Sequence, residues 1–543
     1  MKTNLKNIGY CPQRSIVYAK GEIFNLKELG LSSISDPHIL DCYAQFGIKW
    51  FEKIRGSFAI AIAVDNKTIL VRDQFGEVPL YYNVGDDGRV KCGDSVRGLL
   101  LNDVDRKLDR NGLFCYMAFG CLYSPLTMVE GIKAVPAGYA VIVEGKAVRV
   151  CRYWTPKFEL KEWSCSNLQM SIERELLRAI GEQTQDSPAA LLSGGIDSSA
   201  IVALWRKQYD GEIRTYCLSH EDVDTDESRW AKLVAERNGT KHTNMVLDGC
   251  TMRKWIDEAV AGYDQPSFDG MNFWFATRFA REYGEKTILS GEGGDELFVG
   301  YWEFKKHRLA YRYAPFLRRF PRFIGRAINA VAPNEQVRKI GMLAGYKGDP
   351  YYLPRRVFND WQIGRLLKKS LWTDDLMVES IGLTKYEPLP SDIINRISWL
   401  EMQTVVADSW MRDGYQTACS NGVSIRTPIC DSKIAEILYT VPGSMKCEPG
   451  LSKPLLVRAA GSGYPDECAR RPKQGFALPF DRYFSGDLKD RIDAFLDGSY
   501  CSLFDENALR AIGRQYRAGK IFWTRIWTLF MVEDWCSRNG VCL

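Results

Sequence analysis

The stretch Leu192-Ser193-Gly194-Gly195-Ile196-Asp197-Ser198-Ser199 decides the fold, because it joins an apolar strand-like segment, PAALLSG, to a helical one, SSAIVALWRKQ. Small residues let the backbone wrap closely around a phosphate group, and N–H groups at a helix start point toward it. The serine hydroxyls add donors, and the Asp197 carboxylate is a ligand type that Mg²⁺ accepts. The sequence lacks the Gly-Lys-Ser/Thr ending of a Walker loop. We therefore predict a phosphate-binding turn of another type at the end of a buried strand.

A second glycine-acid loop, Ser290-Gly291-Glu292-Gly293-Gly294-Asp295-Glu296, follows another strand-like segment, KTILSG. From about Asn167 onward, helices alternate with buried strands, which is typical of a parallel sheet covered by helices on both faces. Carboxyl ends of parallel strands meet at one edge of a sheet, so we expect the two loops to lie together. Asp295 would then complete a Mg²⁺ site with Asp197, and Glu292 would be an acid, a base or a substrate contact.

The pattern of expected strands and helices divides the rest of the chain into two parts. From Ser15 to about Tyr153, short β-rich segments alternate with tight turns, and one helical stretch, Pro37 to Phe51, interrupts them. This pattern predicts a compact β-rich or α+β domain. After Gly300 we expect a mostly helical chain. We place the two domains at residues 1–155 and 165–543.

Composition excludes several classes of protein. The chain has 543 residues, 45% of them hydrophobic and 26% charged, which excludes wholesale disorder and a fibrous repeat. Its start lacks an apolar signal-peptide core, and its longest apolar run, Phe58 to Val64, is too short to span a membrane. Sixteen cysteines without CxxC spacing are typical of reduced thiols. We therefore expect a cytoplasmic protein.

The net charge of +5 is unevenly distributed. Between Trp302 and Ser370, sixteen Lys or Arg residues oppose four acids, so this stretch carries +12 and the remainder −7. Such a stretch is either a solvated helical surface or a docking face for an acidic peptide, a protein or a nucleic acid. No RNA-binding signature accompanies it, which makes nucleic acid the least favoured partner.

Together, the two loops resemble the asparagine synthetase group of ATP pyrophosphatases, and the resemblance covers nearly the whole chain. Asp264-Gln-Pro266, Arg426-Thr-Pro-Ile-Cys-Asp431 and Arg471-Pro-Lys-Gln-Gly-Phe476 resemble further motifs of that family in the same order. The resemblance implies an adenine-nucleotide α-hydrolase-like fold, with a five-stranded parallel sheet between helices and a helical C-terminal part. It also implies that ATP and Mg²⁺ serve to form an acyl-adenylate and pyrophosphate.

The resemblance also implies the roles of individual residues. Lys473 would stabilise negative charge on the α-phosphate or the oxyanion, and Glu292 or Asp413 would accept the proton of the attacking amine. Mg²⁺ would be held by Asp197 and Asp295. The nucleotide-binding residues would be Leu192, Ser193, Gly194, Gly195, Asp197, Ser198, Ser199, Ser290, Gly291, Lys453 and Arg458.

The N-terminal third resembles the family's glutaminase domain, which has an Ntn-hydrolase-like fold, through Lys20-Gly-Glu-Ile-Phe-Asn25 and Arg72 to Tyr82. That domain hydrolyses glutamine with an N-terminal cysteine whose own amine acts as base. Here the sequence begins Met-Lys-Thr, Cys11 is internal, and Lys20 replaces an asparagine that binds glutamine. The segment before Lys20 is also several tens of residues too short for an intact site. We therefore expect a degenerate domain without glutaminase activity and with a structural role.

Three sources of nitrogen fit a ligase without a glutaminase: free ammonia, ammonia from another protein, or an amine carried by the substrate. The last describes two relatives, the β-lactam synthetases and the lasso-peptide macrolactam cyclases. β-Lactam synthetases have Tyr where this chain has Glu292. Where the synthetases usually have Asp or Asn, this chain has Tyr415.

We therefore favour a bacterial lasso-peptide cyclase, an AMP-forming carbon–nitrogen ligase of ribosomal-peptide biosynthesis. It would adenylate an Asp or Glu side chain of a precursor peptide and join it to the peptide's N-terminal amine. Its partners would be the precursor peptide, a leader peptidase and a leader-recognition protein. The alternatives are an ammonia-dependent asparagine synthetase and a β-lactam-synthetase-like small-molecule cyclase.

Overall fold

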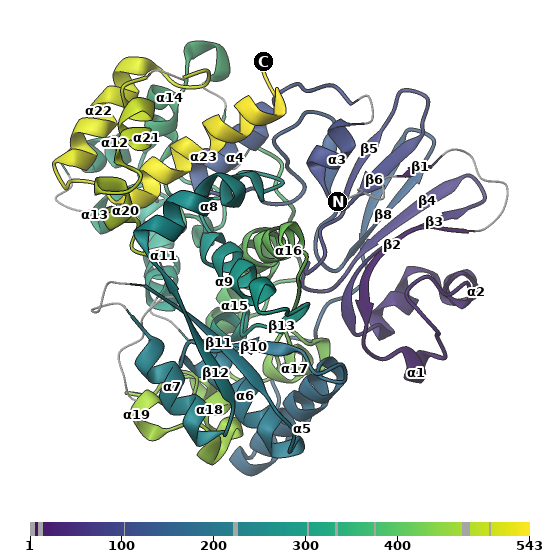
Figure 1. The fold of residues 1–543 in the computed structure, drawn as a ribbon. Coiled ribbons are helices and arrows are strands. Elements are labelled where there is room, and N and C mark those ends of the chain that lie inside the picture. Colours follow the sequence, from purple (N-terminus) through teal and green to yellow (C-terminus); the bar gives the residue numbers. More distant parts are fainter. Residues whose placement is uncertain are drawn as a thin grey trace.

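The computed structural model shows a β-rich N-terminal part beside a larger part that is built on a parallel sheet, with helices over both (Figure 1). No described helix is long and apolar enough to cross a membrane. The structure describes residues 6–8, 15–101, 104–220, 226–300, 303–331, 335–373, 376–378, 380–469, 478–498 and 501–543.

The N-terminal part contains two antiparallel sheets, ordered β2-β3-β4-β8-β9 and β1-β6-β5-β7. In β3, Ala59, Ala61 and Ala63 face the core between the sheets, while Ile60 and Ile62 face the opposite side. The small alanines permit close packing of the two sheets. The strands are β1 Lys6–Ile8, β2 Ser15–Ile23, β3 Gly56–Val64, β4 Lys67–Arg72, β5 Tyr81–Val84, β6 Val90–Gly93, β7 Ile132–Ala134, β8 Tyr139–Glu144 and β9 Ala147–Arg152.

Helices cover the outer faces of both sheets. The predicted helical stretch forms α2 (His38–Phe46) and the short helix η1 (Gly47–Lys53). The expectation of a single helical stretch is wrong, because α4 (Arg110–Phe119) is a further ten-residue helix. Its side chains from Gly112 to Phe119 are all buried, so it has no polar face to mark a helical period. Two shorter helices are α1 (Leu26–Leu29) and α3 (Val96–Leu100).

The predicted parallel sheet is confirmed, with five strands in the order β12-β11-β10-β13-β14. The fifth strand follows residue 300, within the stretch expected to be mostly helical. Its three residues, Ser-Ile-Arg, form no apolar run that would mark a strand in the sequence. The strands are β10 Ala189–Leu191, β11 Arg214–His220, β12 Lys241–Leu247, β13 Thr287–Leu289 and β14 Ser424–Arg426.

Helices cover both faces of this sheet, as predicted. On one face lie α5 (Cys165–Gln183), α6 (Ile196–Gln208) and α7 (Ser228–Arg237). On the other lie α8 (Gly249–Ala261) and α9 (Met271–Glu282). The remaining helices near the sheet are α10 Gly294–Leu297, α17 Ser432–Leu438, α18 Pro454–Ala460 and α19 Asp466–Ala469.

One long helical run packs against β14 at the edge of the sheet. It consists of α15 (Ile393–Glu401), the nine-residue π-helix η4 (Met402–Trp410) and α16 (Met411–Ser420). π-Helical turns are rare and occur frequently at functional sites. The other helices form the basic stretch and the C-terminal layer: α11 Glu303–Leu317, α12 Arg322–Val331, α13 Glu335–Gly341, α14 Asp360–Leu366, α20 Phe480–Ser485, α21 Lys489–Leu496, α22 Glu506–Arg517 and α23 Trp523–Asn539.

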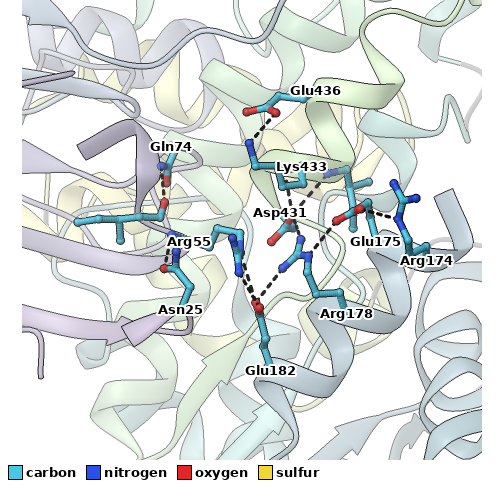
Figure 2. A network of polar contacts seen from close by, with 12 residues as sticks. Asn25, Arg55, Gln74, Arg174, Glu175, Arg178, Glu182, Asp431, Lys433 and Glu436 are labelled. Carbon is cyan, nitrogen blue, oxygen red and sulfur yellow. Dashed lines mark hydrogen bonds and ion pairs between the residues drawn. The ribbon is translucent and has the colours of Figure 1, made fainter. Parts of the chain in front are cut away.

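A polar network joins the two parts of the chain (Figure 2). The Arg55 guanidinium lies 2.7 Å from the Glu182 carboxylate in α5. Glu182 also accepts from Arg178, which lies 2.5 Å from Asp431 at the start of α17. A second contact comes from the Asp264-Gln-Pro266 turn, because Asp264 accepts from the backbone N–H groups of residues 96 and 97 at the start of α3. The Asp-Gln-Pro motif therefore holds the two parts together.

Candidate active site

The two glycine-rich loops lie at the same edge of the parallel sheet, as the sequence predicts. Strands β10 and β13 are neighbours, with Ala190 opposite Leu289, so the loops that follow them emerge side by side. They line a cavity of about 200 Å³. Its lining residues are Leu191, Leu192, Ser193, Gly195, Asp197, Ser198, Tyr216, Cys217, Leu218, Asn272, Phe273, Ser290, Gly291, Glu292, Gly293, Asp295, Glu296 and Trp410.

Glycines of the second loop allow it to pack directly onto the first. A Cβ atom on Gly291 would lie 2.7 Å from Asp197 Cβ and 2.8 Å from the Ser198 backbone nitrogen. A Cβ on Gly294 would lie 2.2 Å from Asp197 Oδ1. Real Cβ atoms do not approach neighbours this closely, so the contact between the loops requires glycine at both positions.

The first loop is arranged as an anion-binding turn. Ser193 Oγ accepts from the Gly195 N–H at 3.2 Å, and Ser198 Oγ accepts from the Ser193 N–H at 3.2 Å. Helix α6 begins at Ile196 without a side-chain cap, so N–H groups of its first turn are available to a ligand. Gly194 has a φ of +72° and packs against the backbone of Trp230, which leaves no room for a side chain.

Lys453 joins the two loops electrostatically. Its ammonium contacts the Asp197 carboxylate and lies 2.8 Å from Asp295 Oδ1. Its side chain is 3% exposed. Burial alone would lower the pKa of Lys453, but the Asp197 and Asp295 carboxylates raise it above its ordinary value. The lysine is therefore a charged partner of both carboxylates.

The residues present fit Mg²⁺. The Asp197 and Asp295 carboxylates converge on one point, since a single ammonium contacts both. Within the described part of the chain, no group of three His, Cys, Asp or Glu side chains could hold a metal. Mg²⁺ is typically bound by one or two carboxylates, with water and substrate phosphates as its other ligands. Two carboxylates beside a phosphate-binding loop match this requirement.

One predicted proton acceptor lines the cavity, and the other is buried and does not line it. Glu292 lines it, and its pKa is raised well above the usual range by burial and then by the Asp269 and Asp413 carboxylates. Asp413 is fully buried below the lining; burial raises its pKa to about 6, although the Arg412 guanidinium opposes this. The Arg412 Nε donates to Asp413 at 2.9 Å. Of the two predicted proton acceptors, Glu292 faces the cavity.

Sequence reasoning missed Asp269 and Trp410. Asp269 accepts from Trp410 Nε1 at 3.0 Å, and burial raises the pKa of its carboxyl group. Trp410 ends the π-helix η4 and lines the cavity. Neither belongs to a loop with a phosphate-binding pattern, and they are brought together across 141 positions of sequence.

Other predicted site residues lie elsewhere. Ser199 is fully buried in α6 and does not line the cavity. Arg458, in α18, is half exposed and pairs with Glu448, so its phosphate contact stays a prediction. Lys473 lies in the segment 470–477, outside the described residues.

Tyr415 points away from the cavity. It is in α16, and its hydroxyl donates to Asp94 Oδ2 at 2.8 Å. Its ring packs against the core between the two N-terminal sheets. The position at which the synthetases usually have Asp or Asn therefore contributes to the contact between the two parts of the chain.

Comparison with known proteins agrees with this geometry. Residues 171–537 match the family model described as asparagine synthase, and residues 10–154 match the glutamine amidotransferase domain. The chain is 24% identical to asparagine synthetase [glutamine-hydrolyzing] 1 of Bacillus subtilis, over 98% of this chain and 84% of that protein. It is 25% identical to a putative asparagine synthetase [glutamine-hydrolyzing] of Mycobacterium tuberculosis, over 96% of this chain and 84% of that protein.

Among solved structures, a glutamine phosphoribosylpyrophosphate amidotransferase from B. subtilis aligns with 44% of this chain and 47% of its own, at 10% identity. Its TM-score is 0.19. The family model covers the sheet, both glycine-rich loops, Lys453 and the helical run behind them. The chain therefore belongs to the asparagine synthase family of ATP-dependent amide-forming ligases.

Proposed function

We propose that this chain is an AMP-forming peptide cyclase of the lasso-peptide type. It adenylates an Asp or Glu side chain within a peptide and closes a macrolactam with the N-terminal amine of the same peptide. Nitrogen then comes from the substrate, and the N-terminal domain serves without glutaminase activity.

The observation that carries the proposal is the bond between Tyr415 and Asp94. A free amino acid presents an ammonium and an α-carboxylate, and both need charged or polar partners in a binding site. At the position where a synthetase has Asp or Asn, Tyr415 offers no charge and is directed into the N-terminal domain. A residue within a peptide carries these groups as amides, so it does not need that partner.

The lining of the cavity supports the same substrate. Its described residues include three aromatic side chains, Tyr216, Phe273 and Trp410, and neither lysine nor arginine. Aromatic walls suit the side chains and backbone of a peptide. Among the lining residues that the structure describes, none provides a cation for the α-carboxylate of free aspartate.

The chemistry places known demands on this site. The substrate carboxylate attacks the α-phosphorus of ATP and displaces pyrophosphate, to which Ser193, Ser198 and the N–H groups of α6 donate. The peptide amine then attacks the acyl carbon and AMP leaves. Mg²⁺, held by Asp197 and Asp295, supplies charge neutralisation on the phosphates when it is bound.

Glu292 accepts the proton that the attacking ammonium must lose. Its carboxyl group lines the cavity, and burial raises its pKa well above the usual range, which makes the carboxylate a stronger base. The proton is thereby removed from the amine before or as the amide bond forms.

The experiment supplies the full chain with ATP, Mg²⁺ and a positional set of synthetic peptides. Each peptide has a free N-terminal amine and one internal Asp or Glu. Mass spectrometry is combined with measurement of AMP and pyrophosphate. We expect AMP together with a product lighter than its peptide by one water. The matched N-acetylated peptides should give no cyclic product, because their amine is blocked.

Two further mixtures test the alternatives. Aspartate with ammonium tests an ammonia-dependent asparagine synthetase, and aspartate with glutamine tests an intact glutaminase. Asparagine from the first mixture would overturn the peptide substrate. Asparagine from glutamine would also overturn the inactive glutaminase.

A further inference from the structure

Helix α11 presents apolar side chains to solvent. Leu309 is 46% exposed, Tyr313 42% and Phe316 59%. In a surface helix of a globular protein, the apolar stripe normally faces the core. Here the exposed stripe lies in the most basic stretch of the chain, among exposed Lys and Arg residues.

The inner face of α11 fixes this orientation. His307 is fully buried, and its Nε2 lies 3.0 Å from the Glu401 carboxylate at the end of α15. Phe304 and Ala314 are also buried, and the Tyr311 hydroxyl donates to Asp349. Rotating the helix to bury its apolar stripe would break these contacts. The stripe therefore faces outward because the fold holds it there.

The spacing of the stripe is that of one strand of a coiled coil. Leu309, Tyr313, Phe316 and the partly exposed Phe320 follow one another at intervals of four, three and four residues, which is the a/d pattern of a heptad. Helical-type hydrogen bonds continue past the end of α11, from the N–H of residue 319 to Phe316 and from that of Phe320 to residue 317. We call this surface the α11 seam.

A basic row flanks the α11 seam. Lys305, Arg312 and Arg319 repeat at intervals of seven residues and are all exposed. They occupy the heptad position that precedes each a residue, where charges select the partner helix. Among the described residues, these three side chains have no carboxylate partner. The seam thus combines an apolar line with positive charge along one side.

We propose that the α11 seam docks an acidic amphipathic helix carried by the peptide substrate. The apolar side chains of that helix would pack on Leu309, Tyr313 and Phe316, and its flanking carboxylates would pair with the basic row. This inference rests on the proposed function for its claim that the helix belongs to the substrate.

The position of α11 explains why the substrate carries the helix. The N–H of Gly300 donates to the Asp295 carbonyl at 2.7 Å, and the Ser452 hydroxyl donates to the Gly300 carbonyl at 2.6 Å. Gly300 packs against the Lys453–Asp295 pair, and helix α11 begins three residues later in the chain. Its fifteen residues extend about 22 Å from there. A helix docked along the seam would place one of its ends near the adenylation site.

The test measures binding of a fluorescein-labelled three-heptad model helix, with Leu at a and d and Glu at e and g, to the full chain. A second probe replaces every Glu with Lys. We expect the acidic probe to bind, and the basic probe to bind about tenfold or more weakly. Affinity should fall as salt concentration rises, because the charges on the rim are exposed.

Variants locate the site. The double variant Arg312→Glu and Arg319→Glu should bind the acidic probe about tenfold or more weakly than the wild type does. It should bind the basic probe more tightly than the wild type does. The matched double variant Arg149→Glu and Arg237→Glu makes the same change of charge at exposed positions elsewhere. It should leave the affinity for both probes unchanged.

A second set tests the apolar line. The pair Leu309→Ser and Phe316→Ser should weaken the acidic probe, whereas Val148→Ser with Val150→Ser, at exposed positions on β9, should not. Equal binding by the wild type and the α11 variants would overturn the proposal. The proposal would also be overturned if the protein bound vesicles containing anionic phosphatidylglycerol and did not bind the acidic probe. That result would identify the seam as a membrane-binding surface.

These measurements separate the two proposals, because they need neither ATP nor turnover. Binding at the seam by a protein that makes asparagine would uphold the docking surface and overturn the peptide cyclase. If the protein cyclises peptides but does not bind the acidic probe, the peptide cyclase is upheld and the docking surface is overturned.

Discussion

The guanidinium of Arg72, at the end of β4, lies 3.2 Å from the carboxylate of Asp408, in the π-helix η4. Both side chains are almost fully buried. Asp408 also accepts from the N–H and the hydroxyl of Ser124, at 2.7 and 2.8 Å. Two residues further on, Trp410 lines the cavity and donates to Asp269. The N-terminal domain therefore fixes one wall of the candidate active site.

Replacing Arg72 with Met should destabilise the whole protein. The change leaves the Asp408 carboxylate buried without its guanidinium, which typically costs about 3–5 kcal/mol. We expect a lower urea midpoint together with a weaker ATP–pyrophosphate exchange. Arg149→Met, at an exposed position, is the control. An unchanged midpoint would show that Arg72 does not support η4.

Asp295→Asn should impair adenylation. The amide cannot balance the charge of Lys453 or bind a hard cation as a carboxylate does, so we expect about a hundredfold loss of ATP–pyrophosphate exchange. The Mg²⁺ concentration for half-maximal exchange should also rise. Asp490→Asn, at an exposed position, should leave both unchanged. A variant with normal Mg²⁺ dependence would contradict the assigned metal site.

Gly291→Ala should separate the two loops without unfolding the protein. The new methyl group would meet Asp197 and the Ser198 nitrogen at distances below 3 Å, so the loops must move apart. Because an error of about 1 Å in position can cost about a hundredfold in rate, exchange should fall on that scale. Gly181→Ala, which meets only the flexible end of Gln208 at 3.3 Å, should retain activity. Similar activity in both variants would refute the close packing of the loops.

The pH dependence of amide formation should respond to Asp269. Glu292 must be ionised to accept a proton, so activity is lost as pH falls below its raised pKa. The negative charge of Asp269 contributes to that raised pKa. Asp269→Asn removes the charge, lowers the pKa of Glu292 and should shift the rising limb of the profile to lower pH. The amide oxygen still accepts from Trp410. A shift to higher pH, or none, would exclude Glu292 as the acceptor.

Tyr415→Phe should leave turnover nearly intact. It removes one hydroxyl that bonds to Asp94, for which the expected loss in the free energy of unfolding is about 1 kcal/mol. If Tyr415 contacted the substrate, the variant would instead raise KM or lower kcat. Steady-state kinetics with the peptide substrate therefore distinguishes a contact between domains from a binding role.

Much of the fold follows from local pattern. Alternating strands and amphipathic helices predict the parallel sheet, and the glycine-rich loops predict its functional edge. Strand β14 consists of Ser-Ile-Arg and lacks the apolar run of β10 and β13, and α4 is buried on all sides, so neither is visible in this way.

The parts of the site that escape prediction depend on distant contacts. Lys453 meets Asp197 across 256 positions, and Asp269 meets Trp410 across 141. The periodic patterns that predict helices and strands depend on residues close together in the sequence, so they do not indicate such pairs. The π-helix η4 is similar, because the residues beside it, such as Arg72 and Tyr351, come from other regions of the chain.

The contacts of the π-helix η4 indicate what loss of the N-terminal domain would do to the rest of the chain. Within nine residues, η4 sends Asp408 to Arg72 and Ser124, Thr404 to Tyr351, and Trp410 to the cavity. A chain without residues 1–155 would lose both partners of Asp408 and would expose to solvent the surface of η4 on which they pack. The two parts of the chain should therefore unfold as one unit, and removing the N-terminal part should destabilise the wall of the cavity whether or not that part has an activity of its own.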